Sequence, residues 1–303
     1  MFDAQYERQT ELLLNLLPGL EEHPCFALKG GTAINLFVRD MPRVSVDIDL
    51  TYLPLKPRTE ALEELSGNLR AFARSSLGRI PDGSVREHRS HGYLIRVTFE
   101  TPQATIKIEP NTVLRGSIYP TESHDLAETA QRRFGLYARV RMLSTADLYG
   151  GKLCAALDRQ HPRDLFDVKL LLEGEGITPE IRRAFVVYLT SHNRPMNELL
   201  NPNLKDISEA FVTQFVGMTE EPVSLAELVD IQRQLPEDLV SQLDEDERAF
   251  LLSIKRGDPD WAILGFNHLE KLPALQWKLH NIRKMNPAKQ CEMLQRLERI
   301  LTR

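Results

Sequence analysis

Hydrophobic and polar positions change their spacing near residue 140. Before it, short segments alternate between apolar and polar residues, as half-buried strands do. Strands are predicted at residues 25–28, which form a short apolar run, and at residues 44–53, 85–89, 93–100 and 105–109. Helical spacing occupies residues 4–18, 32–38 and 58–77. The His91-Gly92 pair predicts a tight hairpin turn. The first part of the chain is therefore expected to be an α/β lobe.

After residue 140, nearly all apolar positions recur three and four residues apart, which predicts helices. Segments 143–158 and 165–173 follow this spacing, with Pro162 between them. From Pro179 onward the helical spacing continues, interrupted by clusters of Pro and Asn. The second part of the chain is expected to be mainly helical.

Composition narrows the class of protein. The 303 residues suffice for two lobes, and with 42% apolar and 27% charged residues the chain should be a globular protein. No stretch approaches the roughly 20 apolar residues of a membrane span. The N-terminus lacks the basic start of a signal peptide. Cys25, Cys154 and Cys291 form no Cys-x-x-Cys pair, so we expect neither disulfides nor zinc, and a cytoplasmic location.

Charge is uneven along the chain, although the net charge is only −5. Residues 219–247 are strongly acidic, whereas residues 275–303 are rich in Lys and Arg. The basic segment is either a surface that contacts RNA phosphates or a solvated helix face, and charge alone leaves both open.

Two aspartates one residue apart suggest metal chemistry. In a strand over residues 44–53, Ser45, Asp47 and Asp49 share one face, and the apolar residues between them share the other. Neighbouring carboxylates repel each other, and a bound divalent cation relieves this repulsion. Mg²⁺ prefers such oxygen ligands together with water and substrate phosphates. The alternative is an exposed strand edge with two solvated aspartates.

The segment Lys29-Gly30-Gly31-Thr32 precedes this strand. Glycines let a backbone approach a ligand closely, and a helix that starts at Thr32 would offer free N–H groups to a phosphate. Together with the aspartates, this arrangement predicts a triphosphate and metal site, with Arg43 offsetting phosphate charge. For the glycines alone, an ordinary tight turn is the simpler interpretation.

A third acid is expected on another strand. Within residues 105–109, Lys107 and Glu109 share one face. Glu109 could hold a second metal or act as a general base on the attacking hydroxyl. A surface Lys/Glu pair is the alternative.

A later cluster combines Lys152, Arg163, Asp164 and Asp167. The two aspartates are three residues apart and would share a helical face. Lys152 could contact a phosphate as a point charge, and Arg163 could bind one through two hydrogen bonds. From spacing alone, a helix with several salt bridges is the favoured interpretation.

These motifs together resemble the AbiEii/AbiGii family of nucleotidyltransferase toxins, a branch of the polymerase-beta-like nucleotidyltransferases that includes the MenT toxins. Residues 26–33 and 42–50 are similar to the first family motif, and Lys152 with residues 163–167 to the second and third. Residues 250–260 and 272–283 are similar to the C-terminal lobe. The superfamily usually has Gly-Ser where this chain has Gly31-Thr32, which keeps the hydroxyl.

The resemblance implies a nucleotidyltransferase domain in residues 1–175, with a mixed sheet flanked by helices, and a helical C-terminal domain in residues 176–303. It implies Mg²⁺- or Mn²⁺-dependent transfer of a nucleotide from an NTP to an RNA acceptor such as the 3′ end of tRNA, which would block translation. A cognate antitoxin of the winged-helix repressor type would neutralise the toxin.

The roles expected of the individual residues follow from these motifs. The metal ligands would be Asp47, Asp49 and Glu109. The catalytic residues would be Asp49, Lys152, Asp164 and Glu109. The nucleotide would be bound by Lys29, Gly30, Gly31, Thr32, Arg43 and Ser45.

Other functions stay open at this point. A small-molecule nucleotidyltransferase of the antibiotic-modifying type would share the same N-terminal site. The basic residues Lys278, Arg283, Lys284 and Lys289 favour RNA over a small acceptor. An inactive NTP-binding regulatory protein is a further alternative, although both aspartates are retained. A metal-dependent phosphatase or nuclease has no clear motif here.

Overall fold

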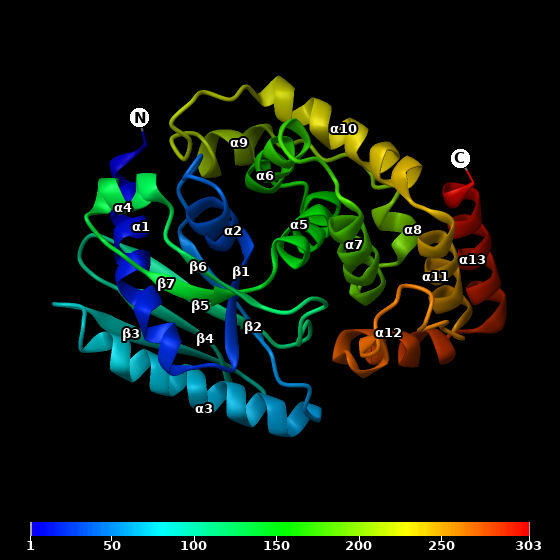
Figure 1. Ribbon diagram of the computed structural model, residues 1–303, viewed down its shortest axis with the longest axis horizontal. Helices are drawn as coiled ribbons and strands as arrows, with labels where there is room; N and C mark the ends of the chain where they lie inside the picture. The colour runs from blue at the N-terminus through cyan, green and yellow to red at the C-terminus, as the bar shows by residue number, and fades with distance from the viewer. Residues whose placement is uncertain (1, 303) are drawn as a thin grey trace. The chain divides into compact units, whose positions relative to one another are not determined.

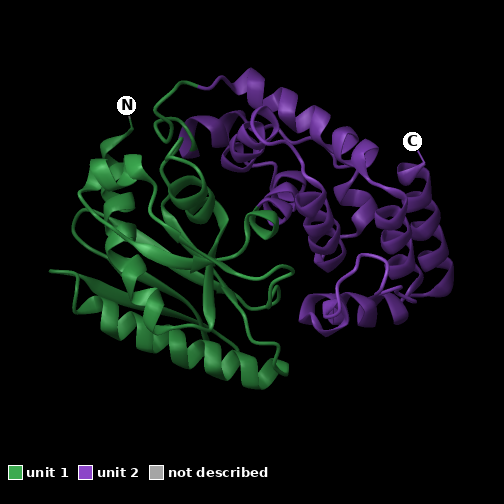
Figure 2. Ribbon diagram, viewed as in Figure 1, with its two compact units in different colours: residues 1–148, 215–222 green, residues 149–214, 223–303 purple. Residues whose placement is uncertain are grey.

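The computed structural model describes residues 2–302, which form two compact units (Figure 2). Unit 1 comprises Met1–Leu148 and Phe215–Pro222, and unit 2 comprises Tyr149–Gln214 and Val223–Arg303. Unit 1 is α/β and unit 2 is helical, as the change in hydrophobic spacing predicts. The expected division into a nucleotidyltransferase domain, residues 1–175, and a helical C-terminal domain, residues 176–303, stays a prediction.

Unit 1 is built on a seven-stranded mixed sheet with the order β3-β4-β5-β2-β1-β7-β6 (Figure 1). The strands are β1 Phe26–Lys29, β2 Asp47–Tyr52, β3 Ser84–Ser90, β4 Tyr93–Glu100, β5 Thr105–Asn111, β6 Glu122–Asp125 and β7 Arg139–Met142. The β2–β5 and β1–β7 pairs are parallel, and the other neighbours are antiparallel. The predicted fold class, a mixed sheet flanked by helices with a helical C-terminal part, is confirmed.

Register at the centre of the sheet places three chemistry-bearing residues in one row. Asp49 of β2 lies opposite Lys29 of β1 and beside Glu109 of β5. Side chains at paired positions of neighbouring strands point to the same face. The sheet therefore brings residues from three separate segments to one place.

Alternation of burial explains why these segments pair as they do. Ile48 and Leu50 of β2 and Ile106 and Ile108 of β5 are fully buried, whereas the residues between them stay partly or largely exposed. A one-residue shift in register would expose every one of these apolar side chains. The same alternation keeps the aspartates of β2 off the buried face.

The β3–β4 hairpin turns at the predicted pair, where His91 has φ 48° and Gly92 has φ 86°. Two positive φ values are what a two-residue type I′ turn needs. Helix α3 packs against β4, and Figure 1 shows it lying along one side of the sheet with α2 on the other side. The helical segments of unit 1 are α1 Ala4–Leu16, η1 Leu17–Glu22, α2 Gly30–Ala33, η2 Ile34–Val38, α3 Arg58–Leu77 and α4 Glu128–Phe134.

Three elements have no counterpart in the sequence prediction: β6, α4 and β7. Strand β6 reads Glu-Ser-His-Asp and has no apolar residue, so it lacks any periodic signal. Backbone pairing with β7 at the end of the sheet defines it instead. Strand β7 is short but joins β1, with Leu28 opposite Met142.

Unit 2 is composed of helices, as its spacing predicts. Its helices are α5 Thr145–Arg159, α6 Pro162–Glu173, α7 Pro179–Ser191, α8 Met196–Leu199, α9 Ser208–Gln214, α10 Leu225–Gln242, α11 Glu245–Arg256, η3 Leu269–Lys271, α12 Pro273–Arg283 and α13 Pro287–Leu301, with the first turn of α5 assigned to unit 1. Pro162 opens α6 at its first position, where a missing N–H costs nothing. Over the described residues, no helix combines the length and apolarity needed to cross a membrane.

Candidate functional site

Asp47 and Asp49 stand on the same face of β2, as alternation along a strand requires. Both side chains are half-buried, and Ile48 between them is fully buried. Ile48 packs into the core on the opposite face of the strand. Two carboxylates are thus presented together on a rigid support.

The glycine bend lies directly against one of these carboxylates. Gly30 has φ +75°, and a Cβ added to it would lie 2.7 Å from Oδ2 of Asp49. Only glycine adopts this conformation without strain and leaves this space. Lys29, the preceding residue, is the cross-strand partner of Asp49. The predicted proximity of bend and acid is therefore found.

The helix after the bend begins earlier than predicted, at Gly30 instead of Thr32. Lys29 occupies the N-cap position, and no side chain caps the first turn. The helix continues through η2, whose five residues are wound as a π-helix, a form often found at functional sites. The uncapped N–H groups of this turn are the kind of donors that bind phosphate.

Thr32 lies inside this helix and contacts the residues before and at the start of β2. Its Oγ1 lies 2.5 Å from the backbone oxygen of Asp47 and 2.9 Å from Oγ of Ser45. Because Thr32 is fully buried, these contacts fix the helix to the start of β2. Thr32 thereby positions the bend against the aspartates.

Ser45 departs from its predicted place. Strand β2 begins at Asp47, so the face shared by Ser45 and the aspartates in an extended strand from residue 44 is not formed. The backbone before the strand pairs elsewhere, with Val44 N donating to Met218 O. Ser45 is buried, and its hydroxyl contacts Thr32. Its role in binding a nucleotide stays a prediction.

Arg43 lies beside the second glycine of the bend. A Cβ on Gly31 would meet Nη2 of Arg43 at 2.5 Å. The side chain is only 2% exposed, and Nη1 donates to the backbone oxygen of Val44. A guanidinium is thus held against the uncapped turn, where it can offset the charge of a bound phosphate.

Glu109 joins the row of the sheet but is engaged by a residue that the sequence did not single out. Arg96 of β4 donates from Nε to Oε2 at 2.8 Å and from Nη2 to Oε1 at 3.1 Å. The nearby carboxylates of Glu109 and Asp47 raise the pKa of Arg96. Within residues 2–302, no group of three or more His, Cys, Asp and Glu side chains is arranged to hold a metal ion. The role expected of Glu109 as a metal ligand beside Asp47 and Asp49 stays a prediction.

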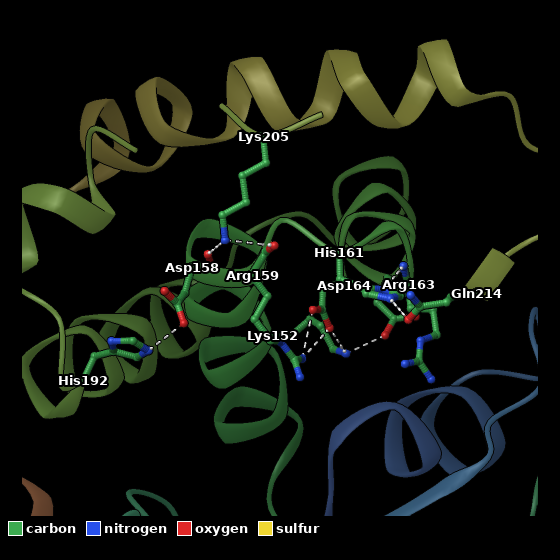
Figure 3. A network of polar contacts seen from close by, with 10 residues as sticks. Lys152, Asp158, Arg159, His161, Arg163, Asp164, His192, Lys205 and Gln214 are labelled. Carbon is green, nitrogen blue, oxygen red and sulfur yellow. Dashed lines mark hydrogen bonds and ion pairs between the residues drawn. The ribbon is translucent and has the colours of Figure 1, made fainter. Parts of the chain in front are cut away.

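The second predicted cluster forms a buried ion-pair group in unit 2 (Figure 3). Nζ of Lys152 lies 3.0 Å from Oδ1 of Asp164 and 2.8 Å from Oδ2 of Asp167. Lys152 comes from α5 and both aspartates come from one face of α6, as their spacing predicts. Arg159 adds a contact from Nη2 to Asp164 at 2.9 Å.

Burial and charge act in opposite directions on Asp164. Burial raises the pKa of its carboxyl, but the charges of Lys152 and Arg159 outweigh burial and hold the pKa below its usual value. Asp164 is therefore an anion at neutral pH. The ammonium of Lys152, which is 6% exposed, is surrounded by carboxylates, as the salt-bridge interpretation of this motif expects.

Further contacts extend this network within unit 2. His161 at the start of α6 accepts a hydrogen bond from the backbone N–H of Arg163 and contacts Gln214. Lys205, which the sequence did not mark, donates to the backbone oxygen of Asp158 at the end of α5. These contacts hold the α5–α6 connection in place around Asp164.

Comparison with known proteins identifies the family. A family model described as nucleotidyl transferase AbiEii toxin, type IV TA system, matches residues 11–281. The chain belongs to this family. No curated protein matches the sequence.

A solved structure supports the same fold. MenT4, a nucleotidyltransferase toxin from Mycobacterium tuberculosis H37Rv, aligns with a TM-score of 0.59 over 92% of this chain and 93% of that chain, at 17% sequence identity. At this identity the likeness concerns the fold. Membership of the AbiEii family makes this chain a nucleotidyltransferase toxin of a toxin–antitoxin system.

Proposed function

We propose that this AbiEii-family toxin transfers a nucleotide from an NTP to an RNA acceptor in a reaction that depends on a divalent metal. The observation that carries the proposal is the close approach of the Gly30 backbone to Asp49, where an added Cβ would lie 2.7 Å from Oδ2. It places an uncapped helix turn, suited to phosphate, beside a pair of carboxylates suited to a cation. Neither feature alone would distinguish an enzyme from an ordinary strand and turn.

The donor set fits Mg²⁺ or Mn²⁺ with two protein ligands, Asp47 and Asp49. Mg²⁺ commonly takes one or two carboxylates and completes its shell with water and substrate phosphates. Glu109 is left out of the proposed shell because both of its oxygens accept hydrogen bonds from Arg96. When bound, the metal would neutralise phosphate charge during transfer.

The residues of the bend would bind and orient the triphosphate. The backbone N–H groups of Gly30 and Gly31 would donate to phosphate oxygens, and Arg43 and Lys29 would add positive charge. Thr32 keeps the turn fixed to β2 through its contact with the backbone of Asp47. The acceptor hydroxyl would attack the α-phosphorus and release pyrophosphate. Most of the rate enhancement would come from positioning and from charge stabilisation.

Lys152 and Asp164 would contribute through their ion pair. In the described arrangement Lys152 is held by two carboxylates, so its side chain is fixed in place. We propose that Asp164 positions Lys152 and that the catalytic roles expected for both depend on this pairing.

The acceptor and the neutralising partner complete the proposal. RNA, with the 3′ end of tRNA as the first candidate, fits the basic C-terminal segment. Transfer to a tRNA end would block translation. Family membership implies an antitoxin, and a winged-helix repressor is the type proposed here.

The test is transfer of a labelled nucleotide from each of the four NTPs, with magnesium, to total tRNA or to small hydroxylated and aminated acceptors. Mass spectrometry of the tRNA identifies the added nucleotide and its position. Asp49→Ala should abolish transfer while the protein still folds, whereas the exposed Asp82→Asn should retain it. Transfer to small acceptors alone would favour the antibiotic-modifying alternative. Near-normal transfer by Asp49→Ala would refute the assignment.

A further inference from the structure

Helix α12, shown in orange in Figure 1, carries aromatic and basic residues that are exposed to solvent. Trp277 is 59% exposed, although a folded chain normally buries most of such a large aromatic side chain. His280 and Lys284 follow it at spacings of three and seven residues, which places all three on the same side of the helix. Both are exposed as well.

The opposite side of α12 packs into the core of unit 2. Leu275, Leu279 and Ile282 are buried, and the helix packs on α7 and α11 of the same unit. Lys278 also lies on this side, where its Nζ donates to the backbone oxygens of His192 and Arg194 at 2.6 and 2.7 Å. The exposure of Trp277 is therefore not required for packing of the helix.

The ring of Trp277 is held in a defined orientation. It stacks on His280 with ring centroids 5.6 Å apart and an angle of 20° between the planes. A flat ring backed by a second ring leaves one face free for a further planar group. Nucleic-acid bases are planar groups that stack on exposed aromatic side chains, whatever the base.

Charge around this face favours an anionic partner. From Lys271 to Cys291 the chain has five Lys and Arg residues and no Asp or Glu. Lys271, Lys284 and Lys289 are exposed, and among the described residues none of them forms an ion pair. Arg283 uses Nε to bind the backbone oxygen of Gly257 and is likewise exposed. A strand of RNA offers both bases for the ring and phosphates for these cations.

We propose that Trp277, His280 and Lys284 form a stacking surface for an unpaired base of single-stranded RNA, with the neighbouring cations contacting its phosphates. This inference rests on the proposed function in that it names a contact of the RNA acceptor. It differs from the expectation based on charge alone, because Lys278 faces the interior and cannot take part.

The two tryptophans of the chain, Trp261 and Trp277, allow a direct test. Binding of a 12-nucleotide single-stranded RNA, labelled at its 5′ end, is measured without NTP by fluorescence anisotropy. Trp277→Ala should weaken binding about tenfold, the effect of losing one stacked base. Trp277→Phe should keep most of the affinity. Tyr137→Ala, which removes a similarly exposed aromatic ring (62%) from unit 1, should leave it unchanged.

A second readout follows the ring itself. In Trp261→Phe, all tryptophan fluorescence comes from Trp277, and RNA should quench it to saturation with the same affinity. Lys284→Gln should weaken binding less and reduce its dependence on salt. Calorimetry with NTP and magnesium should give the same affinity for Trp277→Ala as for the unaltered protein.

The outcomes separate this inference from the proposed function. If Trp277→Ala binds RNA normally, or if RNA does not quench Trp277, the stacking surface is refuted, while transfer assays can still support the enzyme. If Trp277→Ala keeps RNA binding but is no longer neutralised by the antitoxin, the face belongs to a protein partner and the inference is equally refuted. If the unaltered protein transfers no nucleotide but RNA still quenches the fluorescence of Trp277, the proposed function alone is refuted.

Discussion

Substitution of Gly30 by alanine tests whether the glycine bend serves the carboxylate pair. The backbone at Gly30 has φ +75°, and the added Cβ would lie 2.7 Å from Oδ2 of Asp49. The left-handed conformation costs an alanine about 1–2 kcal/mol. The contact with Asp49 is closer than non-bonded atoms normally allow, so the carboxylate must also turn away.

Displacement of the carboxylate adds to the cost. A side chain driven about 30° from its preferred rotamer costs about 0.5–1.5 kcal/mol. Together the two effects should lower the free energy of unfolding by about 2–3 kcal/mol. For a unit of this size, that corresponds to a fall of about 5–10 °C in the melting temperature.

Gly135 provides a matched control. It also has a left-handed backbone, with φ +62°, but an added Cβ meets no atom within 4 Å. Gly135→Ala should therefore pay the conformational cost alone, about 1–2 kcal/mol. It lies at the end of α4 and should not affect transfer. The difference between the two variants isolates the contact with Asp49.

The assay combines thermal unfolding with nucleotide transfer below the melting temperature of both variants. Gly30→Ala should lose transfer by about 100-fold, because a shift of about 1 Å in a catalytic group costs that much. Metal binding measured by calorimetry with an NTP should weaken in parallel. The reasoning fails if Gly30→Ala matches Gly135→Ala in stability and keeps normal transfer.

Three further predictions concern the other ionisable groups. Lys152→Met should destabilise the protein by about 3–5 kcal/mol, since it removes the buried cation that Asp164 and Asp167 share; a denaturant midpoint like that of the unaltered protein would contradict this. Glu109→Gln should reduce transfer less than tenfold, because Arg96 already neutralises that carboxylate; a loss as large as that of Asp49→Ala would restore Glu109 as a metal ligand. Burial lowers the pKa of Lys278 to about 8 from 10.5, so its protonated form is disfavoured in the folded state. The free energy of unfolding should then rise with pH above about 8, by up to about 3 kcal/mol. Urea unfolding at several pH values should show a smaller rise for Lys278→Met than for the unaltered protein.

Much of the candidate site could be predicted because its parts lie close together in the sequence. The bend and the aspartates are fewer than twenty residues apart, and the bend follows β1, which pairs directly with the aspartate strand β2. Alternation along β2 then fixes which side chains share a face. Local rules of turns, glycines and strand phase were sufficient for this part.

Other features depend on contacts between distant segments, which local rules do not specify. Arg96 reaches Glu109 only because β4 and β5 are neighbours in the sheet. Ser45 looked like part of a strand, but the backbone before Asp47 pairs with residues near 218. The hydrophobic spacing of these two segments does not predict that they pair.

The basic C-terminal segment shows how a charge count and a structure can lead to different conclusions about a partner. In the sequence, Lys278 was one of four cations that favoured RNA. In the structure it is buried, and its Nζ donates to two backbone carbonyls of the segment between α7 and α8, so it contributes to folding. The surface that RNA could reach is instead marked by Trp277, whose ring is open to solvent and held by His280. Phosphate contacts are weakened by salt, whereas stacking on a ring is largely not. A substantial RNA affinity that survives high salt would therefore be the signature of Trp277, and a complete loss of affinity with salt would indicate that the lysines act alone.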